Sequence, residues 1–124
     1  MLNTCTVMGF IPTKNAAKAR AFYVDLLGLR FISEDPFAIE VEANGTPIRI
    51  VSAPDFTPLS FTLLGWKVPD IVAIAQELTG KGVVFERYKW FEQDAYGIWT
   101  APGGTQIAWF RDPDGNTLSL SQHM

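Results

Sequence analysis

The feature that most constrains the fold is an order of predicted elements that occurs twice along the chain. Each half is predicted to contain an apolar strand, a helix and then further strands, and a proline-containing stretch at about 54–58 separates the halves. Neither half can cover the apolar face of its strands alone, so we expect the two to pair. The prediction is one α+β domain over 1–124, in which two βαβββ modules (about 1–53 and about 59–124) form a curved, mostly antiparallel sheet around a cleft.

Helix and turn signals support this order. Asn15 or Thr13 is expected to cap the first helix, whose apolar residues recur at helical spacing until Gly28 ends it. The Pro-Asp pair at 69–70 opens the second helix, because proline suits the first turn and an acidic residue favours its positive end. The Asn-Gly pair at 44–45 predicts a tight turn. The predicted strands are residues 5–12, 29–33, 37–42, 48–51, 59–68, 83–88, 97–100, 105–111 and 117–122.

Charge and composition argue against several classes of protein. A formal net charge of -3 is unsuited to a phosphate-binding surface, so we expect no nucleic-acid partner. No apolar run approaches the roughly 20 residues that cross a bilayer. Residues 1–10 show no signal-peptide pattern, so we expect a cytoplasmic protein without a membrane partner. Cys5, the only cysteine, excludes an internal disulfide and is expected to be buried, whereas His123, the only histidine, is expected to be solvated.

Three stretches of the sequence resemble a known family. They are ARAFY followed by LGL within 19–29, GWKVPDI at 65–71 and FRDPDGN at 110–116. Together they are similar to the vicinal-oxygen-chelate superfamily, which includes glyoxalase I, extradiol dioxygenases, and bleomycin and fosfomycin resistance proteins. The resemblance covers nearly the whole chain and implies the paired-module fold, a cleft for a small organic molecule and a homodimer. It implies no single activity, because function is set by the site.

Metal-using members of this superfamily place their ligands on the first and last strands of each module. Carried over through the three stretches, those positions fall on Met8, Arg49, Leu63 and Ser119. None suits a divalent ion, which takes carboxylate, carbonyl or imidazole ligands, and an arginine cation repels it. We therefore expect no metal and no cofactor. This brings the chain nearer to the metal-free branch, typified by bleomycin-binding proteins, and argues against metal-dependent glyoxalase I or dioxygenase activity.

The same positions, combined with strand alternation, predict which side chains line the cleft. Ser119 is expected to share a face with Trp109 across the last hairpin. Arg49 is expected either to be an exposed edge-strand residue, or to neutralise Glu40 or Glu42 or grip a ligand anion. The predicted ligand-binding residues are Met8, Phe10, Arg49, Leu63, Tyr96, Trp109 and Ser119. The weaker candidates for catalysis are Glu40, Glu42 and Asp94.

Two functions from different classes remain open at this point. The first is metal-independent binding of a planar or hydrophobic small molecule in an aromatic cleft. The second is a lyase, isomerase or dioxygenase-type enzyme of the same superfamily, working by acid–base chemistry. Such an enzyme needs a carboxylate with a perturbed pKa inside the cleft, whereas a binding protein needs stacked aromatic rings.

Overall fold

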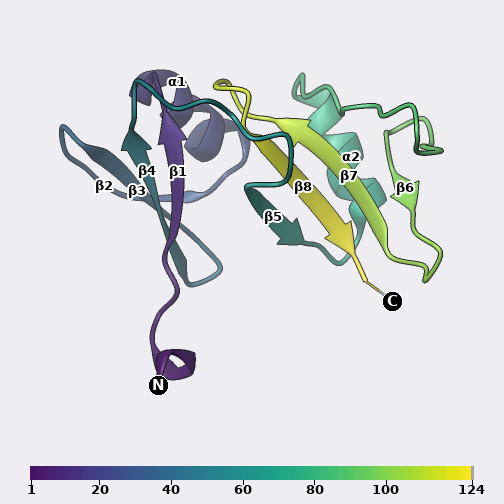
Figure 1. Ribbon diagram of the computed structural model, residues 1–124, viewed down its shortest axis with the longest axis horizontal. Helices are drawn as coiled ribbons and strands as arrows, with labels where there is room; N and C mark the ends of the chain where they lie inside the picture. Colours follow the sequence, from purple (N-terminus) through teal and green to yellow (C-terminus); the bar gives the residue numbers. More distant parts are fainter. Residues whose placement is uncertain (124) are drawn as a thin grey trace. The chain divides into compact units, whose positions relative to one another are not determined.

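The strands of the molecule form two four-stranded sheets, one in each half of the chain. The computed structural model describes residues 1–123, which fall into two units, residues 1–57 and 58–123. The division lies within the predicted linker at 54–58. Each unit packs helical residues against its own sheet (Figure 1). The predicted α+β class, built from two strand–helix–strand modules, is therefore confirmed.

The first unit begins with a helical turn and contains a mixed sheet. Its elements are η1 (Leu2–Thr4), β1 (Gly9–Thr13), α1 (Ala16–Arg20), η2 (Ala21–Leu26, a π-helical continuation of α1), β2 (Arg30–Glu34), β3 (Ala38–Ala43) and β4 (Thr46–Ser52). The strand order is β1-β4-β3-β2, and only β1 and β4 are parallel. Asn15 caps α1 as predicted, because its side-chain oxygen accepts the Lys18 N–H at 3.0 Å. The predicted turn joins β3 to β4 through Asn44 and Gly45, both with positive φ.

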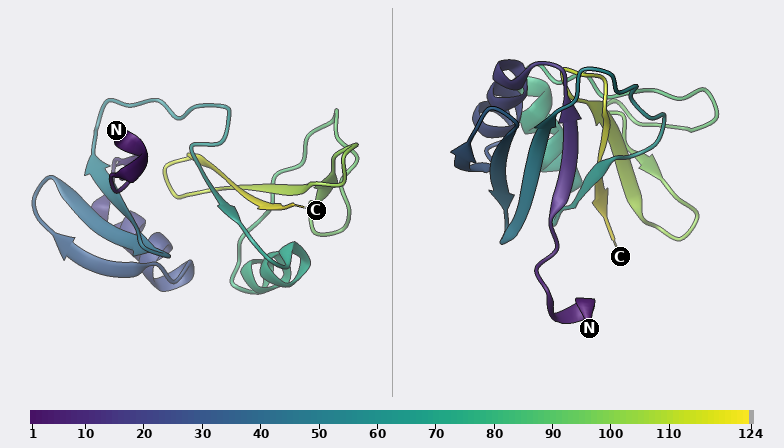
Figure 2. Two further views of the ribbon diagram at one scale, coloured as in Figure 1. Left: turned by 90° about the horizontal axis from the view of Figure 1, so that it is seen from below. Right: turned by 60° about the vertical axis from the view of Figure 1, so that its left-hand side comes forward.

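Alternation along the strands of this unit sorts the side chains onto two faces. The largest buried side chains of the helix-covered face are Ile11, Tyr23, Ile39, Val41, Ile48 and Ile50. Their strand neighbours Phe10, Arg49 and Glu40 lie on the opposite face. Figure 2 shows α1 and η2 on one side of this sheet. The face that carries Arg49 is therefore the one that these helices leave open.

The second unit repeats the plan with a longer helix. Its elements are β5 (Leu64–Lys67), α2 (Ile71–Gly80), β6 (Trp99–Thr100), β7 (Gln106–Arg111) and β8 (Thr117–Gln122). The strand order is β5-β8-β7-β6, with only β5 and β8 parallel. α2 packs against β7 and β8 and buries Ile71, Ala75 and Leu78 over Phe110 and Leu118. Trp109 and Ser119 are paired across the β7–β8 hairpin, as predicted, on the face away from this core.

The two opening strands are shorter than predicted. β1 starts at Gly9 rather than at residue 5, so Met8 lies just before it and Cys5 is exposed, not buried. Extending the register by one residue would place Met8 opposite Pro47, which has no N–H for the ladder. Likewise β5 starts at Leu64, and Leu63 lies just before it.

The strand predicted over 83–88 does not form. Val83 and Phe85 are buried and Val84 is 82% exposed, which produces the alternation that suggested a strand. The segment nevertheless makes only one backbone hydrogen bond to β7 among the described residues, from Glu86 N–H to the Trp109 carbonyl at 2.8 Å. The alternation therefore reflects packing of an irregular segment rather than a hydrogen-bonded ladder. The short strand predicted over 97–100 is confined to Trp99 and Thr100.

Candidate functional site: an aromatic cleft in the second unit

The second unit contains a small cleft whose walls are uncharged and largely aromatic. Its volume is about 240 Å³. The lining residues are Ser60, Phe61, Thr62, Tyr88, Trp90, Phe91, Trp109 and Thr117. They come from the segment before β5, from the irregular segment after α2, and from β7 and β8. Concave apolar surface with a few hydroxyl groups is typical of sites for small organic molecules.

Stacked rings build the main wall of the cleft. The Phe91 ring lies parallel to Trp109, with an interplanar angle of 3° and centroids 5.2 Å apart. It also stacks on Trp99 at 4.3 Å. The Tyr88 ring meets Trp109 edge-on at 5.4 Å and stacks with Trp90 at 5.2 Å. These offset and edge-to-face arrangements are the ones that aromatic quadrupoles favour, so the five rings support one another.

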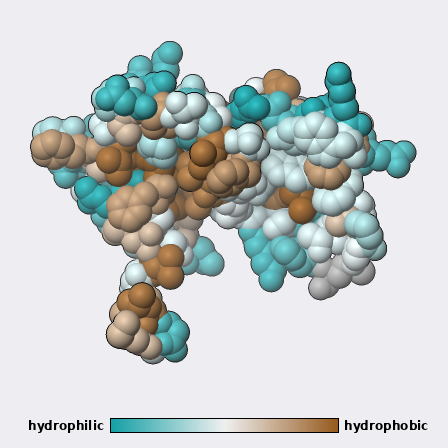
Figure 3. All heavy atoms as spheres, in the orientation of Figure 1, coloured by the Kyte–Doolittle hydropathy of each residue, from teal (hydrophilic) through white to brown (hydrophobic). Residues whose placement is uncertain are grey.

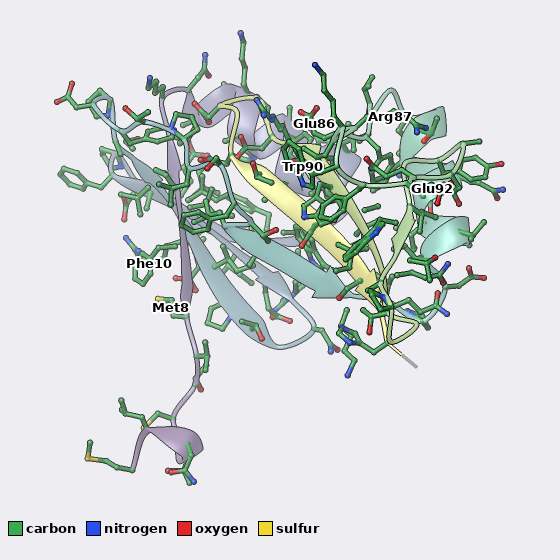
Figure 4. All side chains as sticks on the ribbon, turned by 45° about the vertical axis from the view of Figure 1, so that its right-hand side comes forward. Met8, Phe10, Glu86, Arg87, Trp90 and Glu92 are labelled. Atoms are coloured by element: carbon green, nitrogen blue, oxygen red, sulfur yellow. The ribbon has the colours of Figure 1, made fainter. Side chains whose placement is uncertain are left out.

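Trp90 is the outermost ring of this wall. Its side chain is 74% exposed, and Figure 4 shows it beside β7 and β8 on the irregular segment after α2. Such exposure is unusual for a tryptophan, because large aromatic side chains are normally well buried. Trp90 therefore offers a ring with room for a further planar partner.

The strands explain why Trp109 and its neighbours face the cleft. Trp109 alternates with Ala108 and Phe110, which face α2 and are fully buried. On β5, Gly65 pairs with Ser119, and a Cβ atom at Gly65 would lie 2.8 Å from the Ser119 Oγ. The absence of a side chain at residue 65 is therefore what allows Ser119 its position next to Trp109.

Burial raises the pKa of the Tyr88 hydroxyl above its ordinary value of 10.0, and the nearby Glu86 carboxylate adds to the rise. The Arg111 guanidinium acts in the opposite direction, but it is paired with Glu86 at 2.7 Å. Tyr88 therefore stays a neutral phenol well beyond neutral pH. It can donate or accept a hydrogen bond, but it supplies no charge to the cleft.

Several predicted site residues lie elsewhere in the second unit. The Tyr96 hydroxyl accepts a hydrogen bond from Gln76 on α2 at 2.9 Å. The Asp94 carboxylate accepts the N–H groups of Tyr96 and Ile98, both at 2.9 Å, which makes it a turn-forming group. The N–H of Leu63 donates to the Thr117 carbonyl. Asp94 borders a more open hollow of about 490 Å³, lined by Glu92, Gln93, Asp94, Ile98, Trp99 and Thr100.

The predicted residues of the first unit form a row across its open sheet face. Phe10, Arg49 and Glu40 are register partners on β1, β4 and β3. β4 is an inner strand, so of the two alternatives for Arg49 the edge-strand one is wrong. Arg49 is paired with Glu40 at 3.8 Å. The Glu42 carboxylate binds Arg30 instead, and this contact, with the Gly45 N–H, lowers the pKa of Glu42.

This open face carries exposed apolar side chains as well as the ion pair. Met8 is 38% exposed and Phe10 59% exposed. Figure 4 shows Met8, just before β1, and Phe10, within β1, on the same side of the chain. Figure 3 shows apolar residues gathered over β1 and β4. Of the seven predicted ligand-binding residues, Trp109 lines the aromatic cleft, whereas Met8, Phe10 and Arg49 belong to this face of the first unit.

Apart from Thr117, the lining residues that the prediction did not name come from two short stretches, 60–62 and 88–91. Tyr88, Trp90 and Phe91 lie within four consecutive positions, and all three line the cleft. The density of rings at 88–91, in a segment without regular structure, was the available signal. The prediction instead assigned residue 88 to a strand, and from the following loop it took Tyr96 for ligand binding and Asp94 as a weaker catalytic candidate.

The donor chemistry of the chain does not fit the divalent metal that some members of the resembled family use. The four carried-over positions hold thioether, guanidinium, alkyl and hydroxyl groups. Within residues 1–123, no three His, Cys, Asp or Glu side chains are grouped closely enough to hold a metal ion. Over the same residues, no helix is both long and apolar enough to span a bilayer.

Comparison with known proteins identifies the family. The family model described as Glyoxalase/Bleomycin resistance protein/Dioxygenase superfamily matches residues 2–120. Comparison with curated proteins gave no match.

Three solved structures with similar folds belong to proteins of different kinds. The antibiotic-binding protein TnmS3 from Streptomyces sp. CB03234 is 23% identical, with 100% and 99% of the two chains covered and a TM-score of 0.73. A bleomycin resistance determinant encoded on transposon Tn5 is 19% identical, with 97% and 98% covered and a TM-score of 0.75. Lactoylglutathione lyase from Agrobacterium tumefaciens is 14% identical, with 96% and 93% covered and a TM-score of 0.74. At these identities the structural likeness shows the fold alone. Because the family model matches residues 2–120, the chain belongs to the glyoxalase/bleomycin resistance protein/dioxygenase superfamily.

Proposed function

We propose that this protein binds a planar aromatic small molecule in the cleft of the second unit, without a metal. The observation that carries the proposal is the wall of stacked rings at 88–91 and Trp109, with Trp90 exposed at its end. A planar ligand can extend this stack by the same contacts that hold the rings together. Two structural relatives, an antibiotic-binding protein and a bleomycin resistance determinant, support the proposal by analogy.

The lining of the cleft also indicates what charge the ligand carries. None of the eight lining side chains is ionic at neutral pH, and the nearby Glu86 and Arg111 neutralise each other. Aromatic faces carry negative electrostatic potential, so they attract cations and repel anions. The cleft therefore suits a neutral or cationic planar molecule better than an anionic one, with Ser60, Thr62 and Thr117 as the hydroxyl groups of the lining.

The test is tryptophan-fluorescence titration with three planar probes: acridone (neutral), proflavine (cationic) and anthraquinone-2-sulfonate (anionic). We expect saturable binding of the first two and weaker binding of the third. Trp90→Ala should weaken acridone binding about 3- to 10-fold, the range expected for one stacking contact. Phe37→Ala is the control, because Phe37 is equally exposed at 74% but belongs to the first unit. Absence of saturable binding by any probe to the wild-type protein would contradict the proposal.

The enzymatic alternative has no specific support in the cleft. No carboxylate lines the cleft, and the one titratable lining group, the Tyr88 hydroxyl, is kept neutral by its raised pKa, so the lining holds no general base. Glu40 is paired with Arg49, Glu42 with Arg30, and Asp94 with backbone N–H groups of its own turn. Binding is therefore the function that the geometry supports best.

Three further expectations belong to this proposal. We propose that the two units pair as one domain and unfold in a single cooperative transition, which calorimetry would show.

We propose that the protein forms homodimers, as the family resemblance implies, so light scattering at high micromolar concentration should give twice the 13.8 kDa mass of the chain. We also propose a cytoplasmic location, which fractionation of the native host would test.

A further inference from the structure

The segment that carries Tyr88, Trp90 and Phe91 is held in place without a strand ladder. Its only backbone hydrogen bond to β7 among the described residues is from Glu86 N–H to the Trp109 carbonyl. A single antiparallel bridge joins Gln93 to Trp99. A segment with so few backbone partners needs other contacts to keep one conformation, because ordering each residue costs about 1–2 kcal/mol.

The Arg87 guanidinium supplies two such contacts, to the carbonyls of Asp94 and Ala95, and the side-chain amide of Gln93 supplies three more. Its Oε1 accepts the Tyr88 N–H at 2.8 Å, and its Nε2 donates to the carbonyls of Glu86 at 2.9 Å and Gly97 at 2.8 Å. All three partners are backbone groups, and the side chain is half-buried. One amide therefore ties the start of the segment, at 86–88, to its end at Gly97, in the way that a pair of ladder bonds would.

We propose that Gln93 is a positioning residue for the aromatic cleft. By holding the backbone at Tyr88, it keeps the Tyr88 ring edge-on to Trp109 and keeps Phe91 parallel to Trp109. Gln93 is not among the residues that line the cleft, so it acts through the rings and not by touching the ligand. This inference rests on the proposed binding function, which it deepens by naming what preorganises the site.

The test compares Gln93→Glu and Gln93→Met with Glu92→Gln. Glu keeps the acceptor but, when ionised, offers no donor to the two carbonyls, whereas protonation restores one O–H donor. Met has a similar length and restores nothing. Glu92 is the exposed neighbour of Gln93 and is the matched control for charge and location, visible in Figure 4.

Near-UV circular dichroism follows the packing of the rings, and acridone titration follows the site with a probe that carries no charge. At neutral pH we expect Gln93→Glu to lose much of the near-UV signal and to bind acridone about tenfold more weakly, with the far-UV spectrum unchanged. At about pH 5 or below, the carboxyl of Gln93→Glu should protonate, because ionising it would leave a charge facing two carbonyls. Signal and affinity should then partly recover. Gln93→Met should stay impaired at every pH, and Glu92→Gln should match the wild type.

The experiment distinguishes failure of the positioning role of Gln93 from failure of the proposed binding function. Wild-type near-UV spectra for both Gln93 variants at neutral pH would overturn the positioning role, even where the wild-type protein binds acridone. If the wild type does not bind acridone, the binding function fails, while the pH-dependent near-UV signal still decides whether Gln93 positions the rings. Loss of the far-UV spectrum in both variants would also overturn the proposal, since Gln93 would then be required for folding as a whole.

Discussion

Gly97 is the residue of the cleft-bearing segment with the least freedom to change. It has a φ of +84°, and a Cβ atom there would lie 2.8 Å from the Cβ of the buried Phe85. Its carbonyl also accepts one of the hydrogen bonds from Gln93. Both the backbone conformation and the space available therefore require glycine at this point.

We expect Gly97→Ala to lower the free energy of unfolding by about 1–3 kcal/mol, because it combines a strained φ with a clash. Gly80→Ala is the matched control: Gly80 ends α2, has no positive φ, and an added Cβ would meet nothing within 4 Å. That change should be neutral or slightly stabilising. Urea denaturation of both variants measures the difference, and equal stability of Gly97→Ala and wild type would show that the segment adapts.

Tyr88 is expected to make the free energy of unfolding fall at alkaline pH. Its folded pKa is raised above 10.0, first by burial and then by Glu86, so the unfolded phenol ionises at a lower pH than the folded one. Its contribution is fully present below about pH 10 and is lost as pH rises through the folded pKa. Tyr88→Phe should therefore show a shallower fall in stability at alkaline pH, measured by denaturation at a series of pH values. An unchanged slope in Tyr88→Phe would refute this assignment.

At the scale of elements, both α-helices begin where a polar side chain caps them. Asp70 accepts the Ala73 N–H at 3.1 Å, as Asn15 does for Lys18 in the first unit. The N–H of Ile71, the first residue of α2, has no acceptor within the helix and donates to the Gln122 side chain on β8 at 2.8 Å. The start of α2 is thus fixed both locally and to its sheet. Pro69 lies before the cap and not within the first turn, so the helix starts at Ile71 and not at the predicted Pro69.

Asp70→Ala should lower the free energy of unfolding by about 1 kcal/mol, the usual effect of losing an N-cap. Asp70→Asn should lose little, because the amide oxygen can accept the same hydrogen bond. Thermal melts followed by far-UV circular dichroism at neutral pH compare the two. If both variants melt together, the cap contributes nothing and the contact to Gln122 alone holds the helix start.

At the scale of the whole molecule, we predict that the protein binds no divalent metal at the positions that hold it in metal-using relatives. The four positions carried over from metal-using relatives hold Met8, Arg49, Leu63 and Ser119, and no replacement cluster exists within residues 1–123. A missing single ligand can be replaced by water, but four unsuitable side chains leave no protein ligands to hold an ion.

Elemental analysis of protein purified without chelator should find no stoichiometric metal. Calorimetry with zinc, nickel, manganese and iron(II) should show no micromolar binding, and the acridone affinity should not change on adding these ions. Stoichiometric metal that is lost in Ser119→Ala would contradict the prediction and would show that the carried-over positions or their chemistry are misassigned.

Local signals in the sequence determined the family, the α+β class and much of the framework. Asn15, Asp70, Gly28 and the Asn-Gly turn at 44–45 act within a few residues of their own positions, so capping and turn chemistry predict them well. Strand alternation was enough to pair Trp109 with Ser119, because side chains on a strand repeat with a period of two.

The tertiary structure alone decided the cleft and the partners of its residues. The same alternation at Val83 and Phe85 suggested a strand, but burial produces that pattern whether or not a neighbouring strand supplies hydrogen bonds. Arg49 pairs with Glu40 and not with Glu42 because strand register, which depends on contacts distant in sequence, sets the partner. The stack of Phe91 on Trp99 and Trp109 depends on three segments meeting in space, and no periodicity within one segment encodes such a meeting.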